Sequence, residues 1–312
     1  MVGSSDPRVV GRGFDLVVAK YSANGTPLWT NIFPASGYYN NLGRFLAVDG
    51  GGNVYLTGAS AGADSGQDFL TLKYSTDGAL VWTNRFNGLG NDLDYLPSIA
   101  VDLNGNCAVT RYSVGTNGNF DFATIQYSAS GMPLWTNRFE GAGNDLDGAN
   151  QVAFDAGGNV YITGSSTGSG GEFDLTTIKY SPGGAVLWTN TFKGGSNDYD
   201  VGEALALDKA GNVFVAGAAH TGGPDLNFVT IKYAAPPAPL EFVNSASRVA
   251  FTNSAFVLTL TGPPEANVEI AASIELNTWT PLITNQLTGG SLQFTDTLAS
   301  NYVNRFYRAM VK

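Results

Sequence analysis

One tryptophan-containing segment occurs four times in this chain, as PLWTNIF, LVWTNRF, PLWTNRF and VLWTNTF. The tryptophans are 53 residues apart each time, at Trp29, Trp82, Trp135 and Trp188, and the register holds without insertion or deletion from about residue 14 to residue 233. A fixed period of this length indicates a repeat architecture in which each copy is one supersecondary unit. The repeat therefore constrains the fold more than any other feature of the sequence.

Each copy contains four short segments that alternate with period two and are separated by Gly-rich turns. In the copy at 149–190 they read NQVAFD, VYITGSS, DLTTIKYS and AVLWTNTF, and we name them strands a, b, c and d. Strand a has one large and one small face, whereas strand d carries Trp and Phe, as expected for a sheet that is narrow at an axis and wide at the rim. A period of about 40–50 residues with four antiparallel strands is typical of a β-propeller. A solenoid is the disfavoured alternative, because its coils are shorter and its strands parallel.

The number of blades depends on how the two ends of the repeat region meet. The chain supplies strands c and d (14–33), three complete units, and then strands a, b and c (202–233). We expect the first strand d to complete the last sheet, which gives an all-β propeller of about four to five four-stranded blades. The N-terminal MVGSS is similar to the strand-b segment ITGSS at 162–166, so we also expect the chain to begin inside a repeat of a larger ring.

The pattern GxGNDxD…AxDxxGNVYxTG…DFxTIKYSxxGxxLWTNxF resembles the bacterial SBBP-type β-propeller repeat. The resemblance covers about residues 14–233 and rests on several fixed positions that recur together. It implies an exported or surface-associated bacterial protein, and hence an extracellular or cell-surface location. It does not imply one activity, since a fold of this kind hosts many functions.

The repeat register ends at AAPPAP (234–239), which we interpret as a stiff Pro-rich linker between a propeller domain (1–233) and a second domain (240–312). Segments such as AFVLTLTG, NVEIAAS and SLQFTDT alternate with turns, which predicts a small C-terminal β-sandwich. The NTWTPL and NRFYRAM segments resemble immunoglobulin- or fibronectin-like modules of secreted bacterial proteins.

Composition excludes some partners. The net charge of −10, with no Lys/Arg cluster, argues against nucleic acid. No apolar run reaches the roughly 18 residues of a membrane-spanning helix, and no signal peptide is visible after Met1. The single cysteine, Cys107, takes the place of Val54, Val160 and Val213, and we expect a small buried hydrophobic residue rather than a nucleophile.

Acidic residues recur in two turns of the repeat. Asp49/Asn53 and their equivalents lie in the a–b turns, where Asp and Asn bond the local backbone, and we assign them a structural role. The d–a connections carry a second motif of Asp and Asn residues, whose side-chain oxygens could bind Ca²⁺. Its members are Asn91, Asp92, Asp94, Asn144, Asp145, Asp147, Asn197, Asp198 and Asp200. The alternative, which we favour, is that these groups cap the loop and bond to the adjacent blade.

In an antiparallel meander the d–a and b–c connections emerge at the same end of every sheet. The b–c loops are glycine-rich and differ from one repeat to the next, and binding residues favour loops on a rigid scaffold, so we predict a ligand-binding face there. Its candidate residues are His220, the only histidine, Tyr38, Tyr39 and Arg111, which stands where other repeats have Gly58, Gly164 and Gly217.

These features predict a non-catalytic, exported or surface-associated scaffold that binds a protein or a glycan through its loop face, with Ca²⁺ as a candidate cofactor. The sequence contains no GxSxG, HExxH or P-loop motif, and its carboxylates recur in every blade, whereas a catalytic pair should break the symmetry. Two alternatives remain: a propeller-fold lyase or hydrolase with its site on the same face, and a structural spacer in a larger surface protein.

Overall fold

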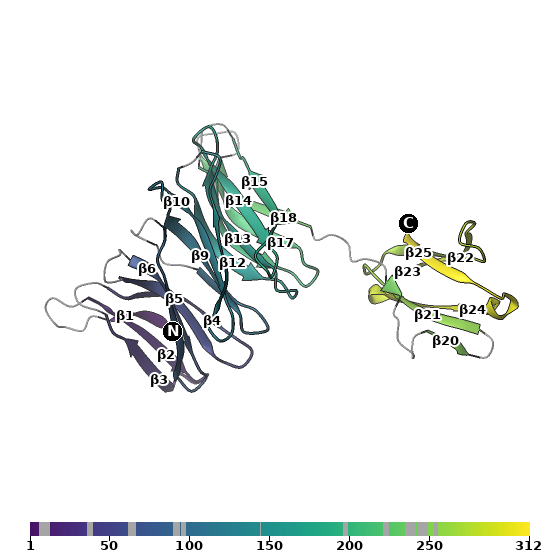
Figure 1. Cartoon of the computed structure of the whole chain (residues 1–312), viewed down its shortest axis with the longest axis horizontal. Helices are drawn as coiled ribbons and strands as arrows, with labels where there is room; N and C mark the ends of the chain where they lie inside the picture. Colours follow the sequence, from purple (N-terminus) through teal and green to yellow (C-terminus); the bar gives the residue numbers. More distant parts are fainter. Residues whose placement is uncertain are drawn as a thin grey trace. The chain divides into compact units, whose positions relative to one another are not determined.

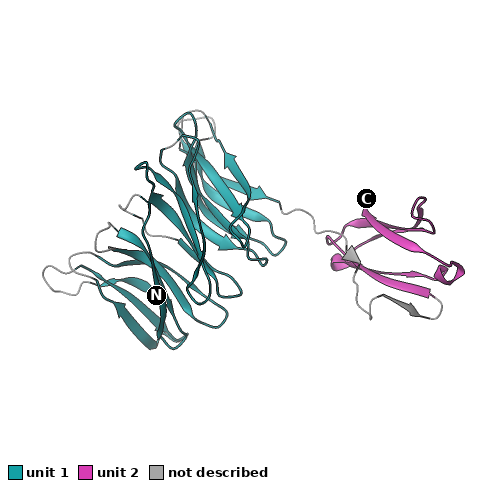
Figure 2. Ribbon diagram, in the orientation of Figure 1, with its two compact units in different colours: residues 1–234 teal, residues 235–312 magenta. Residues whose placement is uncertain are grey.

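The chain forms two compact units, residues 1–234 and 235–312, which are described separately (Figure 2). The computed structural model describes residues 1–5, 13–35, 40–61, 67–89, 94, 98–143, 145–195, 199–220, 225–234, 241–242, 249–252 and 255–312. Strands dominate both units, and the part of the chain that the structure describes contains no helix long and apolar enough to span a membrane.

Unit 1 is a row of five antiparallel sheets that follow one another in chain order (Figure 1). The first contains β1 (Val2–Ser5), β2 (Asp15–Tyr21) and β3 (Pro27–Phe33). The second contains β4 (Leu42–Val48), β5 (Val54–Ala61), β6 (Gln67–Tyr74) and β7 (Leu80–Phe86). The third contains β8 (Ser98–Val101), β9 (Cys107–Val114), β10 (Phe120–Tyr127) and β11 (Pro133–Phe139). The fourth contains β12 (Gly148–Phe154), β13 (Val160–Thr167), β14 (Phe173–Tyr180) and β15 (Val186–Phe192), and the last β16 (Val201–Leu207), β17 (Val213–His220) and β18 (Leu226–Tyr233).

The predicted four-stranded meander is therefore confirmed for the three central sheets. Strands a of successive sheets (β4, β8, β12 and β16) lie beside one another, which is a propeller-like arrangement. One expectation is wrong: β3, the first strand d, does not complete the last sheet. It pairs with β2, whose other edge is taken by β1, so the first sheet already consists of strands b, c and d.

The local sequence explains the tight hairpins. In each a–b turn an aspartate accepts hydrogen bonds from the backbone, as Asp49 Oδ1 does from the N–H groups of Gly51 (3.0 Å) and Asn53 (2.9 Å). Asn53 Nδ2 donates to the other carboxylate oxygen at 2.8 Å. The same contacts recur at Asp102, Asp155 and Asp208. The structural role predicted for these residues is confirmed.

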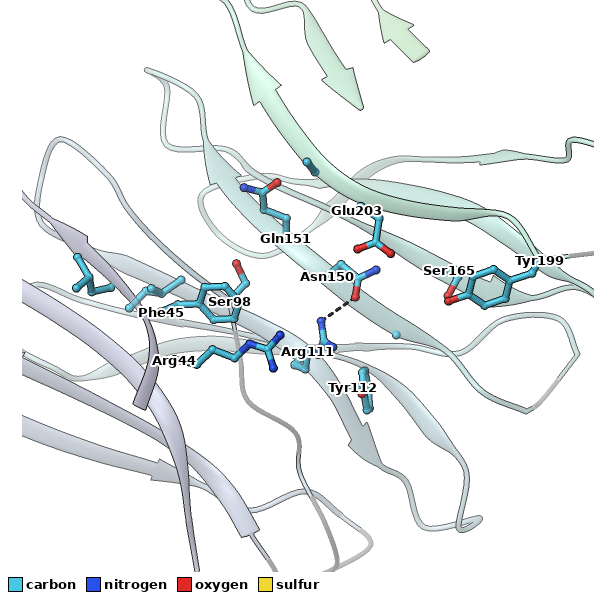
Figure 3. A pocket seen from close by; sticks show the side chains of 14 residues that line it. Arg44, Phe45, Ser98, Arg111, Tyr112, Asn150, Gln151, Ser165, Tyr199 and Glu203 are labelled. Atoms are coloured by element: carbon cyan, nitrogen blue, oxygen red, sulfur yellow. Dashed lines mark hydrogen bonds between the residues drawn. The ribbon is translucent and has the colours of Figure 1, made fainter. Parts of the chain in front are cut away.

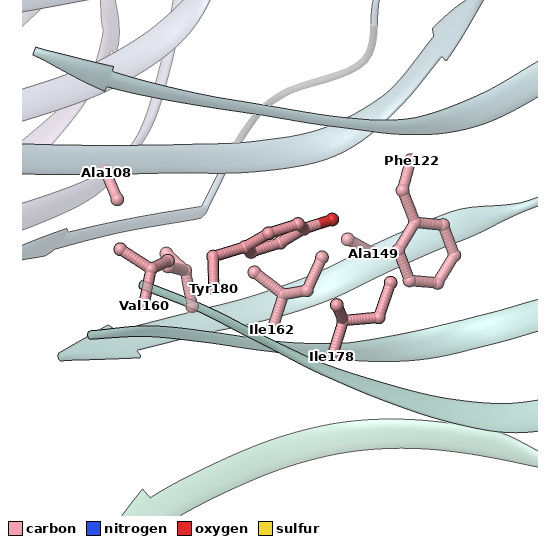
Figure 4. Packing of buried hydrophobic residues seen from close by; sticks show 8 residues of the cluster. Ala108, Phe122, Ala149, Val160, Ile162, Ile178 and Tyr180 are labelled. Carbon is pink, nitrogen blue, oxygen red and sulfur yellow. The ribbon is translucent and has the colours of Figure 1, made fainter. Parts of the chain in front are cut away.

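Each sheet packs face to face on the next, and the four interfaces of unit 1 hold its hydrophobic core. Figure 4 shows the cluster between the third and fourth sheets. At the rim, the tryptophan of one sheet packs against a tyrosine of the next, as Trp82 does against Tyr127 with ring centroids 6.1 Å apart. Trp82 Nε1 and Asn84 Nδ2 donate to the Ala129 and Gly131 carbonyls of the following sheet, at 3.2 and 2.7 Å.

Cys107 is fully buried in one of these interfaces, as predicted, and burial raises the pKa of its thiol to about 12.

Unit 2 has two antiparallel sheets that share one hydrophobic core, to which Leu258, Ile270 and Phe294 belong. One sheet contains β19 (Glu241–Phe242), β20 (Val249–Thr252), β21 (Ala255–Thr261) and β24 (Ser291–Asp296). The other contains β22 (Asn267–Ser273), β23 (Thr280–Gln286) and β25 (Phe306–Val311), and two short 3-10 turns, Thr288–Gly290 and Ala299–Asn301, complete the unit.

The glycine of the c–d turn provides a test of the packing between sheets. Gly131 has φ +86°, and a Cβ there would lie 2.7 Å from Trp82 of the preceding sheet. Gly25 has the same backbone conformation (φ +85°) in the first sheet, but nothing lies within 4 Å of its Cβ position. We expect Gly25→Ala to lower the free energy of unfolding by about 1 kcal/mol through φ strain alone.

Gly131→Ala carries the same strain and also forces Trp82 to move, which costs about 1–3 kcal/mol more. Denaturant unfolding of the two variants measures this difference. Equal destabilisation would contradict the close packing of Trp82 on Gly131.

Candidate ligand site between the inner strands

An open cavity of about 630 Å³ lies where strands a of successive sheets come together, and we call it the axial cavity (Figure 3). It is lined at the end of the sheets from which the d–a and b–c connections emerge. Its lining residues are Arg44, Phe45, Leu46, Ser98, Ile99, Arg111, Tyr112, Gly148, Asn150, Gln151, Ser165, Tyr199, Glu203 and Ala204. Polar side chains from the last four sheets therefore meet in one space.

Three of these polar residues occupy one position of the repeat. The pairing of strands a and b skips a residue at Arg44, at Asn150 and at Glu203, so each lies at a β-bulge. A bulge leaves one residue unpaired in the ladder and changes the direction of its side chain. Here the bulge presents the cation of Arg44, the amide of Asn150 and the carboxylate of Glu203 to the axial cavity. The three sheets therefore share the backbone geometry at this position but differ in the side chain that it carries.

Of the two predicted binding residues that the structure describes, Arg111 and His220, Arg111 on β9 lines the cavity. In the other sheets its place requires glycine, because a Cβ at Gly58, Gly164 or Gly217 would lie 1.9 Å from a carbonyl oxygen of strand a. The described pairing of β8 with β9 begins at Thr110, one residue short of Arg111. Arg111 is thus a local departure from the repeat that adds a long cationic side chain to the site.

The Arg111 guanidinium is held in place by its neighbours. One of its terminal nitrogens donates to Asn150 Oδ1 at 2.7 Å, as Figure 3 shows, and the group lies over the Tyr112 ring at 4.6 Å. Asn150 is fixed in turn, because its Nδ2 donates to the Gly202 carbonyl at 3.0 Å. The buried Arg111 Nε has no hydrogen-bond partner among the described residues. Arg111 is therefore oriented in advance and keeps unused donor capacity.

An aromatic pocket of about 300 Å³ adjoins the axial cavity and shares Tyr112, Gly148, Ser165 and Tyr199 with it. Tyr112 meets Phe120 edge to face at 5.4 Å, and Tyr199 meets Phe173 in the same way at 5.5 Å. Burial and the nearby Glu203 carboxylate raise the pKa of the Tyr199 hydroxyl. The site thus combines a polar cavity with an apolar, aromatic extension.

Of the other candidate binding residues, only His220 is among the described residues, and it does not line this cavity. His220 ends β17, and its backbone N–H donates to Asp200 Oδ1 at 3.0 Å. Tyr38 and Tyr39 lie outside the described residues.

The acidic motif has a clear structural role at its third position. Asp94, Asp147 and Asp200 are all buried, at 1%, 1% and 3% exposure. The Asp147 carboxylate accepts hydrogen bonds from the backbone N–H groups of Gly141 and Thr167, and its own N–H donates to the Phe120 carbonyl of the preceding sheet at 2.7 Å. This residue therefore ties the connection to both neighbouring sheets, as the structural alternative proposes.

The rest of the acidic motif bears on the calcium prediction only in part. Asp145 is exposed, and Asn91, Asp92, Asn144, Asn197 and Asp198 lie outside the described residues. Within the described ranges, no group of three or more His, Cys, Asp or Glu side chains is placed to hold a metal ion. Calcium binding by these connections stays a prediction.

Sequence reasoning missed most of the axial cavity. A signal was present: one position of strand a reads Arg44, Pro97, Asn150 and Glu203 in successive repeats, and Tyr112 stands where the others have Ala59, Ser165 and Ala218. When one position of an otherwise repeated strand varies, its side chain does not take part in the packing between sheets that all repeats share. Which of these positions converge depends on the bulges, and no bulge is visible in the sequence.

The sequence matches no protein-family model and no curated protein, so the resemblances to SBBP repeats and to immunoglobulin-like modules stay predictions. Among solved structures, the chain is similar to Drosophila Plexin A in complex with Semaphorin 1b, with 8% identity over 94% of this chain and 78% of that one (TM-score 0.43). It is also similar to an exo-β-1,3-galactanase from Phanerochaete chrysosporium, with 9% identity over 96% and 90% of the two chains (TM-score 0.35). A GH43 endo-arabinanase from Bacillus licheniformis matches at 11% identity over 74% and 88% (TM-score 0.32). Likeness at this level does not define an activity or a ligand.

The buried carboxylates predict a pH dependence of stability. Burial raises the pKa of Asp147 to about 6, above its ordinary value of 3.8. The folded state therefore binds more protons than the unfolded state between these values, and this group's contribution is lost as pH rises through about 6. We expect the stability of the wild type relative to Asp147→Asn to fall by about 2 kcal/mol between pH 4 and pH 7.

Denaturant unfolding of both proteins across this range measures the effect. Asparagine is a suitable replacement because Asn41 occupies the equivalent position in the second sheet, where it is equally buried (2% exposed). If the stability of the wild type relative to Asp147→Asn stayed constant or rose between pH 4 and pH 7, the raised pKa of Asp147 would be contradicted.

Proposed function

We propose that this chain is a non-catalytic, exported or surface-associated glycan-binding protein, a β-propeller with a C-terminal β-sandwich, whose ligand occupies the axial cavity. The observation that carries the proposal is the convergence of unlike polar groups, Arg44, Arg111, Asn150 and Glu203, beside the Tyr112 and Tyr199 rings. Sugars present hydroxyl groups that both donate and accept hydrogen bonds, and C–H faces that pack on aromatic rings. A polar cavity with an aromatic extension suits both features.

The two guanidinium groups favour an acidic sugar. Arg111 is fixed by Asn150 and Tyr112, and the structure gives Arg44 one ring contact, over Phe45 at 5.3 Å. Guanidinium groups recognise carboxylates through parallel, charge-assisted hydrogen bonds. The chain carries a net charge of −10, so two arginines in one cavity are a local exception to its acidic character. A glycan with uronic acid units is the ligand we infer.

A hydrolase is the less favoured alternative. Glycosidases commonly use two carboxylates about 5–9.5 Å apart. Among the fourteen described residues that line the axial cavity, Glu203 is the one carboxylate. Asp147 lines the adjoining aromatic pocket, but both of its oxygens accept backbone hydrogen bonds. Binding therefore fits the cavity better than hydrolysis.

Replacement of Arg111 by glycine tests the proposal, because glycine is the residue that the other three repeats carry. We expect Arg111→Gly to weaken binding of a uronic-acid oligosaccharide about 10–100-fold, as loss of a charge-assisted hydrogen bond does. Isothermal titration calorimetry with the acidic oligosaccharide and its neutral counterpart measures this loss, and Lys209→Ala, at an exposed a–b turn, is the control for charge alone. Unchanged binding in Arg111→Gly would remove the axial cavity as the site.

Glu203 separates the binding protein from the hydrolase and from a spacer. We expect Glu203→Gln to strengthen binding of the acidic oligosaccharide about 2–10-fold, because a like charge leaves the cavity. Calorimetry gives the affinity, and a reducing-sugar assay on the wild type gives the hydrolysis. Reducing ends released by the wild type but not by Glu203→Gln would establish the hydrolase. A spacer would bind no oligosaccharide in either form.

A further inference from the structure

The last sheet of unit 1 has one covered and one uncovered face. Along β17 buried and less buried residues alternate strictly, and Val213 and Val215 are buried against the fourth sheet, whereas Phe214 and Ala216 are not. The uncovered side, which we call the trailing face, consists of Phe214, Ala216, Ala218, Phe228, Thr230 and Lys232. Two of its six residues are phenylalanines.

The repeat shows what this face does elsewhere. Phe228 is 79% exposed, whereas the residues at its position in the other sheets, Leu16, Phe69, Phe122 and Leu175, are at most 1% exposed. All four are buried because the following sheet covers them. Thr230 is likewise exposed, although Thr71, Thr124 and Thr177 are buried. The trailing face thus keeps the composition of an interface, although none of the described residues of unit 1 covers it.

The first sheet has the opposite half of the same interface uncovered. We call it the leading face, which consists of Val17, Ala19 and Tyr21 on β2. Ala19 is buried and Val17 half-buried, so Tyr21 is the open part of this face. Tyr21 is 47% exposed, whereas Tyr74, Tyr127 and Tyr180, which occupy its position in the second, third and fourth sheets, are at most 4% exposed. The first and last sheets lie at opposite ends of the row (Figure 1). Because Phe228 and Tyr21 are both exposed in one molecule, the trailing face and the leading face do not cover each other.

We propose that a second copy of this chain docks head to tail, with the leading face of its first sheet on the trailing face of the last sheet. The contact would continue the interface that already joins sheets two to five to their predecessors. One polar contact follows from the register: Lys20 Nζ and Lys73 Nζ donate to the Thr76 and Ala129 carbonyls of the next sheet, at 2.8 and 2.9 Å. Lys232 takes the same position, and its acceptor would be the Ala23 carbonyl of the second copy.

The contact is heterologous, because it joins two different faces. A symmetric dimer would instead join two copies of the same face. A second copy is favoured over a foreign partner because both halves of the interface belong to this chain. The axial cavity lies between the inner strands and shares no residue with either face, so this assembly does not depend on the proposed function.

Sedimentation velocity of the full chain tests the proposal. We expect the wild type to sediment as a multiple of its 32.7 kDa chain mass. Phe228→Asp and Tyr21→Asp should each sediment as a single chain, because each places a charge in a buried interface. Leu187→Asp, at an exposed apolar residue of β15 outside both faces, is the control and should assemble as the wild type does.

Mixing the two variants gives the decisive result. Phe228→Asp keeps an intact leading face and Tyr21→Asp keeps an intact trailing face, so the mixture should form a one-to-one complex that neither forms alone. A wild type that stays a single chain at its highest soluble concentration would overturn the proposal. Failure of the mixture to associate would overturn it as well. Mixing restores a head-to-tail contact, because one variant supplies an intact leading face and the other an intact trailing face, but it does not restore a symmetric contact.

Discussion

The packing of one sheet on the next is the contact on which unit 1 depends. Each sheet buries its own hydrophobic residues only against a neighbour, and the four interfaces contain the buried clusters of the unit. The rim contact is equally regular: Trp82 covers Gly131, packs against Tyr127 and donates to the Ala129 carbonyl. A repeat that is stabilised by nearest neighbours in this way gains its stability from the interfaces as much as from each sheet.

Packing also explains where the chain departs from its repeat. Residues that serve an interface are held constant, such as the tryptophan of strand d and the c–d turn glycine that it covers at Gly78, Gly131 and Gly184. Residues that face the axis are released from that constraint, and there Arg44, Asn150 and Glu203 differ in charge although they share one bulge. The shared backbone therefore forms the frame of the axial cavity, and these variable positions supply its unlike polar side chains.

Much of the fold could be predicted from the sequence, because the 53-residue period fixes the strands and the alternation fixes their faces. The position of β3 could not, since the same strand d can pair with either of two strands c, and only the folded chain shows that it stays with β2, whose other edge β1 takes. Arg111 could be predicted as a site residue because it replaces a glycine. Glu203 and Tyr199 could not, because only the bulge and the folded d–a connection bring them to the cavity.

Hydrogen–deuterium exchange of β17 against β13 tests the dependence on neighbouring sheets most directly. Both are strands b and both are hydrogen-bonded to a strand on either side, but only the sheet of β13 is covered on both faces. In dilute solution the account predicts that β17 amides exchange at least about tenfold faster than those of β13, because local opening there exposes less buried apolar surface. Equal, slow exchange in the two strands at the lowest measurable concentration would show that each sheet is stable by itself, and would contradict the account.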